Sequence, residues 1–284
     1  KLTKSQKVSI KDIKEDLAKP LKMNRLLQGD VGSGKTVVAF LSLLSAVEAG
    51  GQGVLMAPTE ILVQQHFENL RPLGNKVGVV VDALTGRDKG KQRDRKLAAL
   101  LEGKIHILIG THAVFQSGVH FLDLRLAIID EQHRFGVRQR LALGEKGQSV
   151  DVLVMTATPI PRSLALSQYG EMDLTVLTDK PAGRKPVKTV IISDNRVNEI
   201  VLKLKKAIDK KNQAYWVCPL IEESEVLDYT AAEDRFKALR ANLGEGEVGL
   251  VHGQMNSDEK DEVMKKFSEG EIKVLVSTTV IEVG

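Results

Sequence analysis

Apolar and polar residues alternate in blocks along this chain, and most of the apolar blocks are short and continuous. The first block differs, because apolar residues at roughly helical spacing over residues 4–18 predict an amphipathic helix that Pro20 ends. Short apolar runs then predict strands at 25–28, 54–57, 77–81, 105–109, 124–130 and 152–155, with helices at 37–44, 60–70 and 88–102 between them. Runs that are apolar on both faces are typical of parallel strands covered by helices. The pattern therefore predicts an α/β fold with a doubly wound parallel sheet.

The alternation of strands and helices breaks once and then begins again. Residues 179–186 contain two prolines, a glycine and several cations, a composition typical of a hinge. Beyond it, we expect strands at 189–192, 214–218, 248–251 and 273–277, with a helix near 197–208 and another capped near Asn256. We therefore expect two tandem domains, at 1–180 and 189–284, joined by a linker at 181–188. With about four strands, the second domain is expected to be incomplete, as in a fragment.

Composition limits the class of protein more than it identifies one. The 284 residues are enough for two domains, and Cys218 is the single cysteine, which excludes an internal disulfide framework or a multi-cysteine zinc site. No apolar run approaches 18 residues and no signal peptide opens the chain, so we expect a cytoplasmic protein. The formal charge of +4 permits a polyanionic partner without requiring one.

The strongest local signal is a glycine-rich loop between the predicted strand 25–28 and the helix after it. Residues 29–36 read Gly-Asp-Val-Gly-Ser-Gly-Lys-Thr, which is the GxxxxGK[ST] pattern in the strand–loop–helix context that it requires. Glycines allow successive backbone N–H groups to face one concavity, and the helix N-terminus adds positive potential. Lys35 is suited to the terminal phosphates and Thr36 to Mg²⁺. The sequence therefore predicts a nucleoside triphosphate site formed by Gly29, Asp30, Gly32, Ser33, Gly34, Lys35 and Thr36.

Two carboxylates follow the apolar strand 124–130, and they would complete such a site. Asp130 and Glu131 emerge at the carboxyl edge of the sheet, where ligands bind in open α/β folds. We expect Asp130 to hold Mg²⁺ and Glu131 to accept the proton of the attacking water. The alternative is a carboxylate pair merely exposed at a strand end.

Together these motifs resemble those of superfamily 2 nucleic-acid helicases. The matching segments are Gln6, 29–36, 57–60, 110–112, 130–133 and 156–158, and the runs 130–140, 155–162, 219–224 and 277–284 are most similar to bacterial branch-migrating DNA helicases. The resemblance implies two RecA-like domains that bind ATP and Mg²⁺ between them. It also implies the motor core of a monomeric enzyme that remodels branched or duplex DNA, such as replication forks and Holliday junctions, in recombination and repair.

The resemblance also assigns roles to single residues. Gln6 would read adenine, while Thr59, Thr111 and Thr158 would contact the DNA backbone. Arg162 would contact either the DNA backbone or the opposite domain. His133 would couple the ATP site to the second domain. For each threonine, a role as a strand residue or helix N-cap is an equally good interpretation.

Two other functions fit the same motifs. One is a transcription-repair coupling translocase, and the other is an ATP-gated clamp on nucleic acid that does not unwind it. The helicase family also has an arginine-finger segment after the position of Gly284, and such a finger contributes about 10³–10⁵ in rate. We therefore expect this chain alone to bind ATP but to hydrolyse it slowly.

Overall fold

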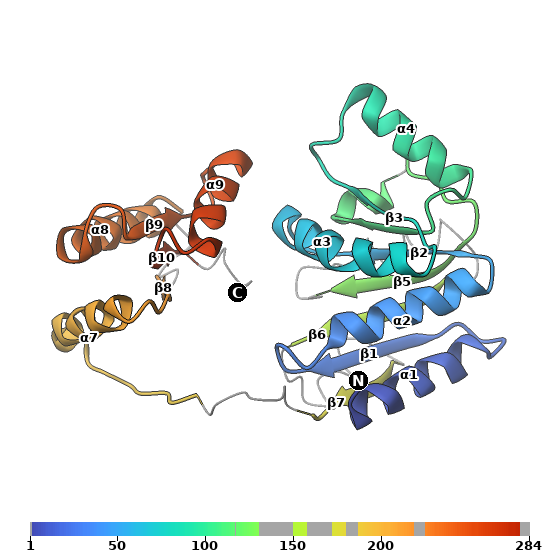
Figure 1. Cartoon of the computed structure of the whole chain (residues 1–284), viewed down its shortest axis with the longest axis horizontal. Coiled ribbons are helices and arrows are strands. Elements are labelled where there is room, and N and C mark those ends of the chain that lie inside the picture. Colours follow the sequence, from blue (N-terminus) through green and yellow to red (C-terminus); the bar gives the residue numbers. More distant parts are fainter. Residues whose placement is uncertain are drawn as a thin grey trace. The chain divides into compact units, whose positions relative to one another are not determined.

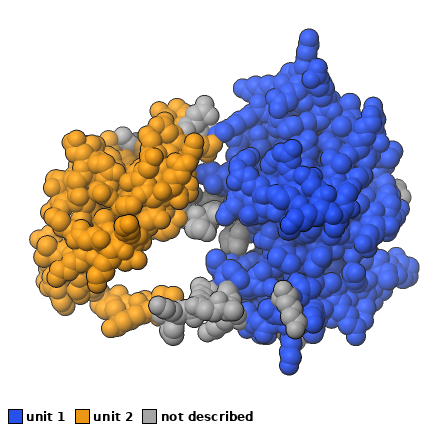
Figure 2. Space-filling view, in the orientation of Figure 1, with its two compact units in different colours: residues 1–185 blue, residues 186–284 orange. Residues whose placement is uncertain are grey.

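The chain folds into two compact units, Lys1–Lys185 and Pro186–Gly284 (Figure 1, Figure 2). A computed structural model describes residues 2–116, 118–130, 150–157, 172–179, 187–218 and 225–278, with the side chains of 225–230 and 257–258 left out. Most of the predicted linker 181–188 lies outside these residues.

Unit 1 is built on a parallel sheet of seven strands in the order β3-β4-β2-β5-β6-β1-β7. The strands are β1 (Asn24–Gly29), β2 (Gln52–Met56), β3 (Val81–Leu84), β4 (Ile107–Gly110), β5 (Leu124–Asp130), β6 (Asp151–Thr156) and β7 (Asp173–Leu177). All five residues of β2 and all four of β4 are buried, as the two-sided apolar pattern predicts for inner parallel strands. The predicted doubly wound parallel α/β fold is confirmed for this unit.

Helices connect these strands and cover the sheet (Figure 1). They are α1 (Lys4–Leu17), α2 (Lys35–Glu48), α3 (Glu60–Lys76) and α4 (Gly90–Leu101), with a short 3₁₀ helix at His112–Phe115. Helix α1 packs on α2 and β7, α2 packs on β2 and β5, and α3 packs on β3 and β4. Among the described helices of the whole chain, none combines the length and apolar character needed to cross a bilayer.

Unit 2 contains a smaller parallel sheet in its described part. Its strands are β8 (Ala214–Val217), β9 (Val248–Val251) and β10 (Val274–Ser277), in the order β8-β10-β9. The 3₁₀ turn Asp194–Arg196 leads into α7 (Val197–Asp209), followed later by α8 (Glu225–Leu243) and α9 (Ser257–Ser268). The predicted cap of α9 is confirmed, because Asn256 and Glu259 form a reciprocal capping box.

Two predicted strands are wrong, and one observed strand was not predicted. The strand predicted at 77–81 is wrong, because α3 continues to Lys76 and β3 begins only at Val81. Residues 77–80 form the turn between α3 and β3. This turn folds closely onto the end of the helix, since a Cβ on Gly74 would lie 2.7 Å from the Val79 carbonyl oxygen. Strand β7 was missed because Asp173 and Thr175 interrupt its apolar pattern.

The strand predicted at 189–192 is also wrong. Residues 187–193 have no regular structure, and the side chains of Val187, Val190 and Ile191 are exposed, Ile191 to 99 %. β-Branched residues favour an extended backbone, but a strand also needs a partner to accept its hydrogen bonds. Within the described part of unit 2, the sheet partners are β8, β9 and β10 alone.

Candidate functional site

The phosphate loop connects β1 to α2 by a tight path. Strand β1 ends at Gly29 and α2 begins at Lys35. Gly32 and Gly34 have φ angles of 76° and 88°, in the left-handed region where L side chains are strained. These two positions therefore explain why the loop needs glycine.

The loop is also closely packed against its surroundings. A Cβ on Gly29 would lie 2.6 Å from the Ser33 hydroxyl oxygen and 2.9 Å from Leu177 Cβ in the neighbouring strand β7. A Cβ on Gly34 would collide with the Gln6 amide of α1. The Ser33 hydroxyl is buried and has no hydrogen-bond partner within the described residues. A buried polar atom without a partner is rare, and a bound anion would satisfy it.

The residues at the start of α2 fit a phosphate ligand. Gly34 occupies the N-cap position, and no described side chain caps this helix end. The start of a helix carries positive potential from its dipole and its outward-facing N–H groups, so this end of α2 favours an anion. The Lys35 ammonium donates to the carbonyls of Gly29, at 2.6 Å, and Asp30, at 3.2 Å, and so lies folded over the loop. Thr36 is half-buried in the same turn.

The sheet register brings Asp130 to the same edge as this loop. Asp130 in β5 is paired with Met155 in β6, and Met155 is paired with Leu27 in β1, two residues before Gly29. With one strand between them, β5 and β1 are about 10 Å apart. The strand order and register therefore place the loop and Asp130 on the same edge of the sheet, as predicted.

Asp130 has a partner that the sequence did not reveal. The imidazole Nε2 of His66, on α3, lies 2.7 Å from Asp130 Oδ2, and the two side chains are 9 % and 11 % exposed. A carboxylate oxygen accepts hydrogen bonds, so this contact assigns the ring hydrogen to His66 Nε2. The two residues are 64 positions apart, and no local pattern links a histidine on a helix to a distant strand end.

Gln6 contacts the phosphate loop from the start of α1. Its amide nitrogen donates to the Ser33 carbonyl at 2.9 Å, and its amide oxygen accepts from the Thr3 N–H at 3.0 Å in a capping box. An amide has a second N–H and a second lone pair, so Gln6 retains one donor and one acceptor for a base. Gln6 therefore belongs to the loop structurally as well as being its predicted adenine reader.

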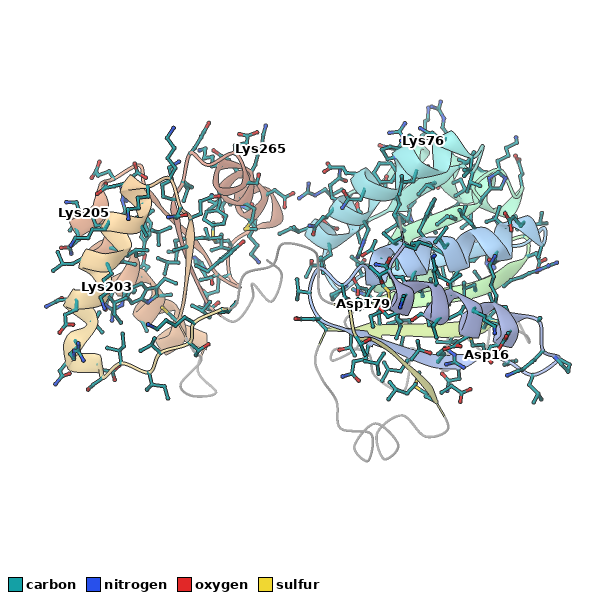
Figure 3. All side chains as sticks on the ribbon, turned by 60° about the horizontal axis from the view of Figure 1, so that its bottom comes forward. Asp16, Lys76, Asp179, Lys203, Lys205 and Lys265 are labelled. Atoms are coloured by element: carbon teal, nitrogen blue, oxygen red, sulfur yellow. The ribbon has the colours of Figure 1, made fainter. Side chains whose placement is uncertain are left out.

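Asp179 fixes the same end of α1 to the chain that follows β7. One carboxylate oxygen of Asp179 accepts hydrogen bonds from the Ser5 hydroxyl at 2.7 Å and the Ser5 N–H at 2.8 Å. These bonds, the hydroxyl first, lower the pKa of Asp179 to about 2. Asp179 lies beside the N-terminal end of α1, whereas Asp16, a residue of the helix itself, lies near its C-terminal end (Figure 3). An ionised carboxylate at a helix N-terminus is favourable, so this contact stabilises the helix that carries Gln6.

Two of the predicted DNA-contacting threonines lie at strand ends on the carboxyl edge. Thr59 follows β2 and caps α3, its hydroxyl accepting from the Leu62 N–H at 3.3 Å, so the helix-cap interpretation is confirmed for this residue. Thr111 follows β4, is buried, and precedes the 3₁₀ helix without capping it. Glu131, His133, Thr158 and Arg162 lie outside the described residues.

These features together fit a magnesium–nucleotide ligand. The loop has a helix N-terminus that no described side chain caps, a cation and a buried hydroxyl, and Asp130 supplies a carboxylate on the same edge. In nucleotide sites, Mg²⁺ is bound by one or two carboxylates and by phosphate oxygens, and the hydroxyl that follows the loop lysine adds a further oxygen. The arrangement is suited to binding a phosphate chain and neutralising its charge.

Known helicases match both units. A family profile for DEAD/DEAH box helicases matches residues 3–166, and one for the helicase conserved C-terminal domain matches residues 196–284. The chain is 50 % identical to the ATP-dependent DNA helicase RecG of Haemophilus influenzae over 99 % of its own length and 41 % of that protein. It is also 50 % identical to RecG of Bacillus subtilis, covering 100 % of this chain and 42 % of the relative.

Solved structures agree with these matches. A structure of RecG bound to a three-way DNA junction has a TM-score of 0.81 and 44 % identity, and it covers all of this chain and 37 % of that one. The Mycobacterium smegmatis helicase Lhr, with a TM-score of 0.67 and 19 % identity over 97 % of this chain, shares the fold. The predicted tandem RecA-like architecture and the resemblance to superfamily 2 helicases are thus confirmed. The chain spans about two-fifths of the curated relatives that it matches. It belongs to the DEAD/DEAH box helicase family.

Proposed function

We propose that this chain is the ATP-driven motor core of a DNA helicase that remodels branched DNA, such as replication forks and Holliday junctions, in recombination and repair. The observation that carries the proposal is the alignment of the phosphate loop with Asp130 on one sheet edge, in a chain 50 % identical to RecG helicases. RecG has been solved on a three-way DNA junction, which supports branched or duplex DNA as the partner here. We include a monomeric state and a cytoplasmic location in the proposal.

The nucleotide is held by the loop in this proposal. Backbone N–H groups from Gly29 to Lys35 surround the phosphates. The Lys35 ammonium leaves the Gly29 and Asp30 carbonyls and binds the terminal phosphates. Gln6 reads adenine with the donor and acceptor that its amide has left. Thr36 and Asp130 hold Mg²⁺, which neutralises developing charge on the phosphates when bound. The contributing loop positions are Gly29, Asp30, Gly32, Ser33, Gly34, Lys35 and Thr36.

The remaining roles concern water and DNA. Glu131 accepts a proton from the attacking water. Thr59, Thr111, Thr158 and Arg162 contact the DNA backbone, and His133 relays the state of the ATP site to the second domain. For Thr59, the hydroxyl oxygen is already used as a helix cap, so its hydroxyl hydrogen is what it can offer to a phosphate.

ATP turnover by the intact protein tests this proposal. We expect a three-way DNA junction to stimulate turnover, and Glu131→Gln to abolish the stimulation while nucleotide binding persists. Turnover that survives Glu131→Gln would refute the assigned base. Stimulation by RNA polymerase rather than by DNA would favour a transcription-repair coupling translocase. DNA binding that depends on ATP without any strand separation would favour a clamp.

A further inference from the structure

The contact between His66 and Asp130 joins two elements that the proposed mechanism treats separately. His66 is 7 % exposed and lies in the second turn of α3, and its ring nitrogen is 2.7 Å from the Asp130 carboxylate at the end of β5. A buried carboxylate is costly unless hydrogen bonds satisfy it. The histidine therefore determines which way this carboxylate is held.

Helix α3 is itself fixed at several points of the same sheet edge. Thr59 caps its first turn directly after β2. Glu60 accepts from the Gly86 N–H at 2.9 Å and lies 3.2 Å from Arg87, in the turn that follows β3. The helix that presents His66 is thus attached to the ends of β2 and β3, and His66 extends the attachment to β5. A hydrogen-bond donor on a well-anchored helix can fix the orientation of its acceptor. A donor on a flexible segment would follow the movements of the acceptor and could not fix it.

We propose that His66 is a positioning residue for Asp130, orienting its carboxylate toward Mg²⁺ in the nucleotide complex. This inference rests on the proposed function, because Asp130 matters in this way only if a metal–nucleotide complex binds. The imidazole engages one carboxylate oxygen, fixes the rotation of the side chain, and leaves the other oxygen for the metal or its water. Removing such outer-shell partners typically costs about 10–100-fold in metal affinity.

A purely structural role for His66 makes a different prediction. If the histidine only satisfied a buried carboxylate, its loss would destabilise unit 1 or weaken nucleotide binding equally with and without metal. If it orients Asp130, its loss reduces the benefit that Mg²⁺ gives to nucleotide binding and leaves metal-free binding unchanged. The quantity to measure is the ratio of the nucleotide Kd in EDTA to the Kd in saturating Mg²⁺, which is the coupling between metal and nucleotide.

The experiment titrates the chain with a fluorescent ATP analogue under both conditions. The variants are His66→Leu, which keeps volume and removes the donor, and His66→Gln, whose amide nitrogen can replace Nε2. The matched control is His106→Leu, which removes a histidine whose Nδ1 accepts from the Val80 N–H at 2.9 Å, just before β4 at the opposite edge of the sheet. We expect His66→Leu to lower the ratio about 10-fold, His66→Gln to recover most of it, and His106→Leu to leave it unchanged.

Each outcome is decisive. A wild-type ratio near one would refute the proposed metal–nucleotide site itself. A large wild-type ratio that His66→Leu preserves would overturn the role of His66 and leave the proposed function intact. If circular dichroism shows that His66→Leu does not fold, His66→Gln is compared with His66→Asn, whose amide is one methylene shorter and falls short of the position of Nε2. Equal ratios of the two Kd values for these variants would overturn the inference, and a lower ratio for His66→Asn would support it.

Discussion

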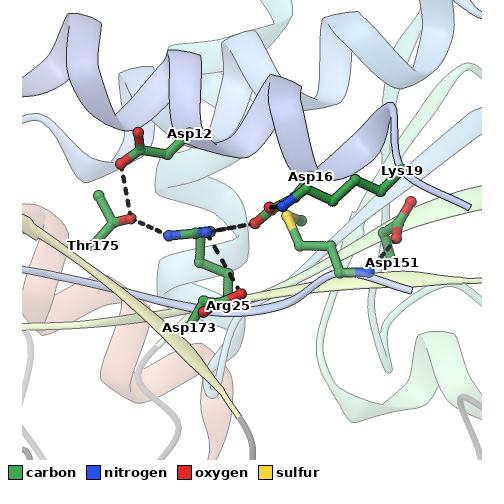
Figure 4. A network of polar contacts seen from close by, with 8 residues as sticks. Asp12, Asp16, Lys19, Arg25, Asp151, Asp173 and Thr175 are labelled. Atoms are coloured by element: carbon green, nitrogen blue, oxygen red, sulfur yellow. Dashed lines mark hydrogen bonds and ion pairs between the residues drawn. The ribbon is translucent and has the colours of Figure 1, made fainter. Parts of the chain in front are cut away.

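Replacing Arg25 by Met removes the centre of a polar network between α1 and the sheet (Figure 4). The guanidinium lies 2.6 Å from Asp16 Oδ2 and donates to the Thr175 hydroxyl at 2.6 Å, and the side chains of Arg25 and Asp16 are 11 % and 6 % exposed. Lys19 also contacts Asp16, at 2.7 Å, but its own side chain is 58 % exposed. Breaking a buried ion pair by removing one partner costs about 3–5 kcal/mol, so we expect Arg25→Met to lower the free energy of unfolding of unit 1 by about 3 kcal/mol.

The pH dependence of this loss has a definite sign. Burial raises the pKa of Asp16, but hydrogen bonds and charge from Lys19 and Arg25 outweigh it, so the pKa lies below 3.8. In the wild type, the stabilisation is therefore present above the unfolded pKa and is lost as the pH falls through the folded pKa. Without Arg25, only Lys19 still offsets the cost of burying the negative charge of Asp16. Protonation of Asp16 removes that charge, so it reduces the loss of stability in the variant. The difference between the two proteins is thus largest at neutral pH and narrows as the pH falls below about 4.

Urea unfolding with two probes measures this effect. Far-UV circular dichroism follows both units, whereas the fluorescence of Trp216, the single tryptophan of the chain, follows unit 2. The control is Arg196→Met, because Arg196 and Glu199 form an ion pair whose side chains are 56 % and 50 % exposed, and solvent screening makes the contribution of such a pair to stability small. A loss for Arg25→Met no larger than for Arg196→Met, or one that widens in acid, would refute the reasoning.

Three further changes test other parts of the structure. Gln52→Leu should destabilise unit 1 by about 3 kcal/mol in urea unfolding, because it leaves the Ile105 carbonyl and the N–H groups of Leu122 and Asp123 unpaired and removes one of the hydrogen bonds to the Leu100 carbonyl; a loss below about 1 kcal/mol would contradict this. Gly34→Ala should weaken nucleotide binding about 10-fold, because its φ of 88° is left-handed and the new Cβ meets Gln6, whereas Gly118→Ala, where a Cβ has open space, should bind normally. Asn256→Ala should lower the stability of unit 2 by about 1 kcal/mol through loss of the α9 capping box, detected by tryptophan fluorescence and absent from the transition of unit 1.

The parts of the fold that could be predicted depend on local signals. Strand β5 was predicted at its observed bounds because seven residues carry a nearly continuous apolar run, and the loop before α2 because its glycines and Lys35 occupy adjacent positions. The edge strand β7 was missed because it is stabilised by pairing with β1, and two of its five residues are polar. The segment 189–192 consists of β-branched residues that favour a strand, but it has no neighbour to pair with among the described strands.

In the candidate site too, features with a local sequence signal could be predicted, and contacts between distant residues could not. The loop and Asp130 could be predicted because each lies at the carboxyl end of a strand and parallel strands share a carboxyl edge. The His66–Asp130 bond and the attachment of Asp179 to Ser5 join residues 64 and 174 positions apart, so they exist only once the sheet order is known. Glu131 is adjacent to Asp130 in sequence, and its assigned role as base stays a prediction.

The affinity of the chain for a fluorescent ATP analogue in saturating Mg²⁺, measured for wild type and Lys35→Ala, tests the central claim most directly. A charged hydrogen bond contributes about 1.5–3 kcal/mol, so we predict saturable binding by the wild type and a Kd about 30-fold higher for Lys35→Ala. Circular dichroism should give the same unfolding transition for both proteins. Equal affinities for the two, or no saturable binding by the folded wild type, would contradict the assignment of this loop as a nucleotide site.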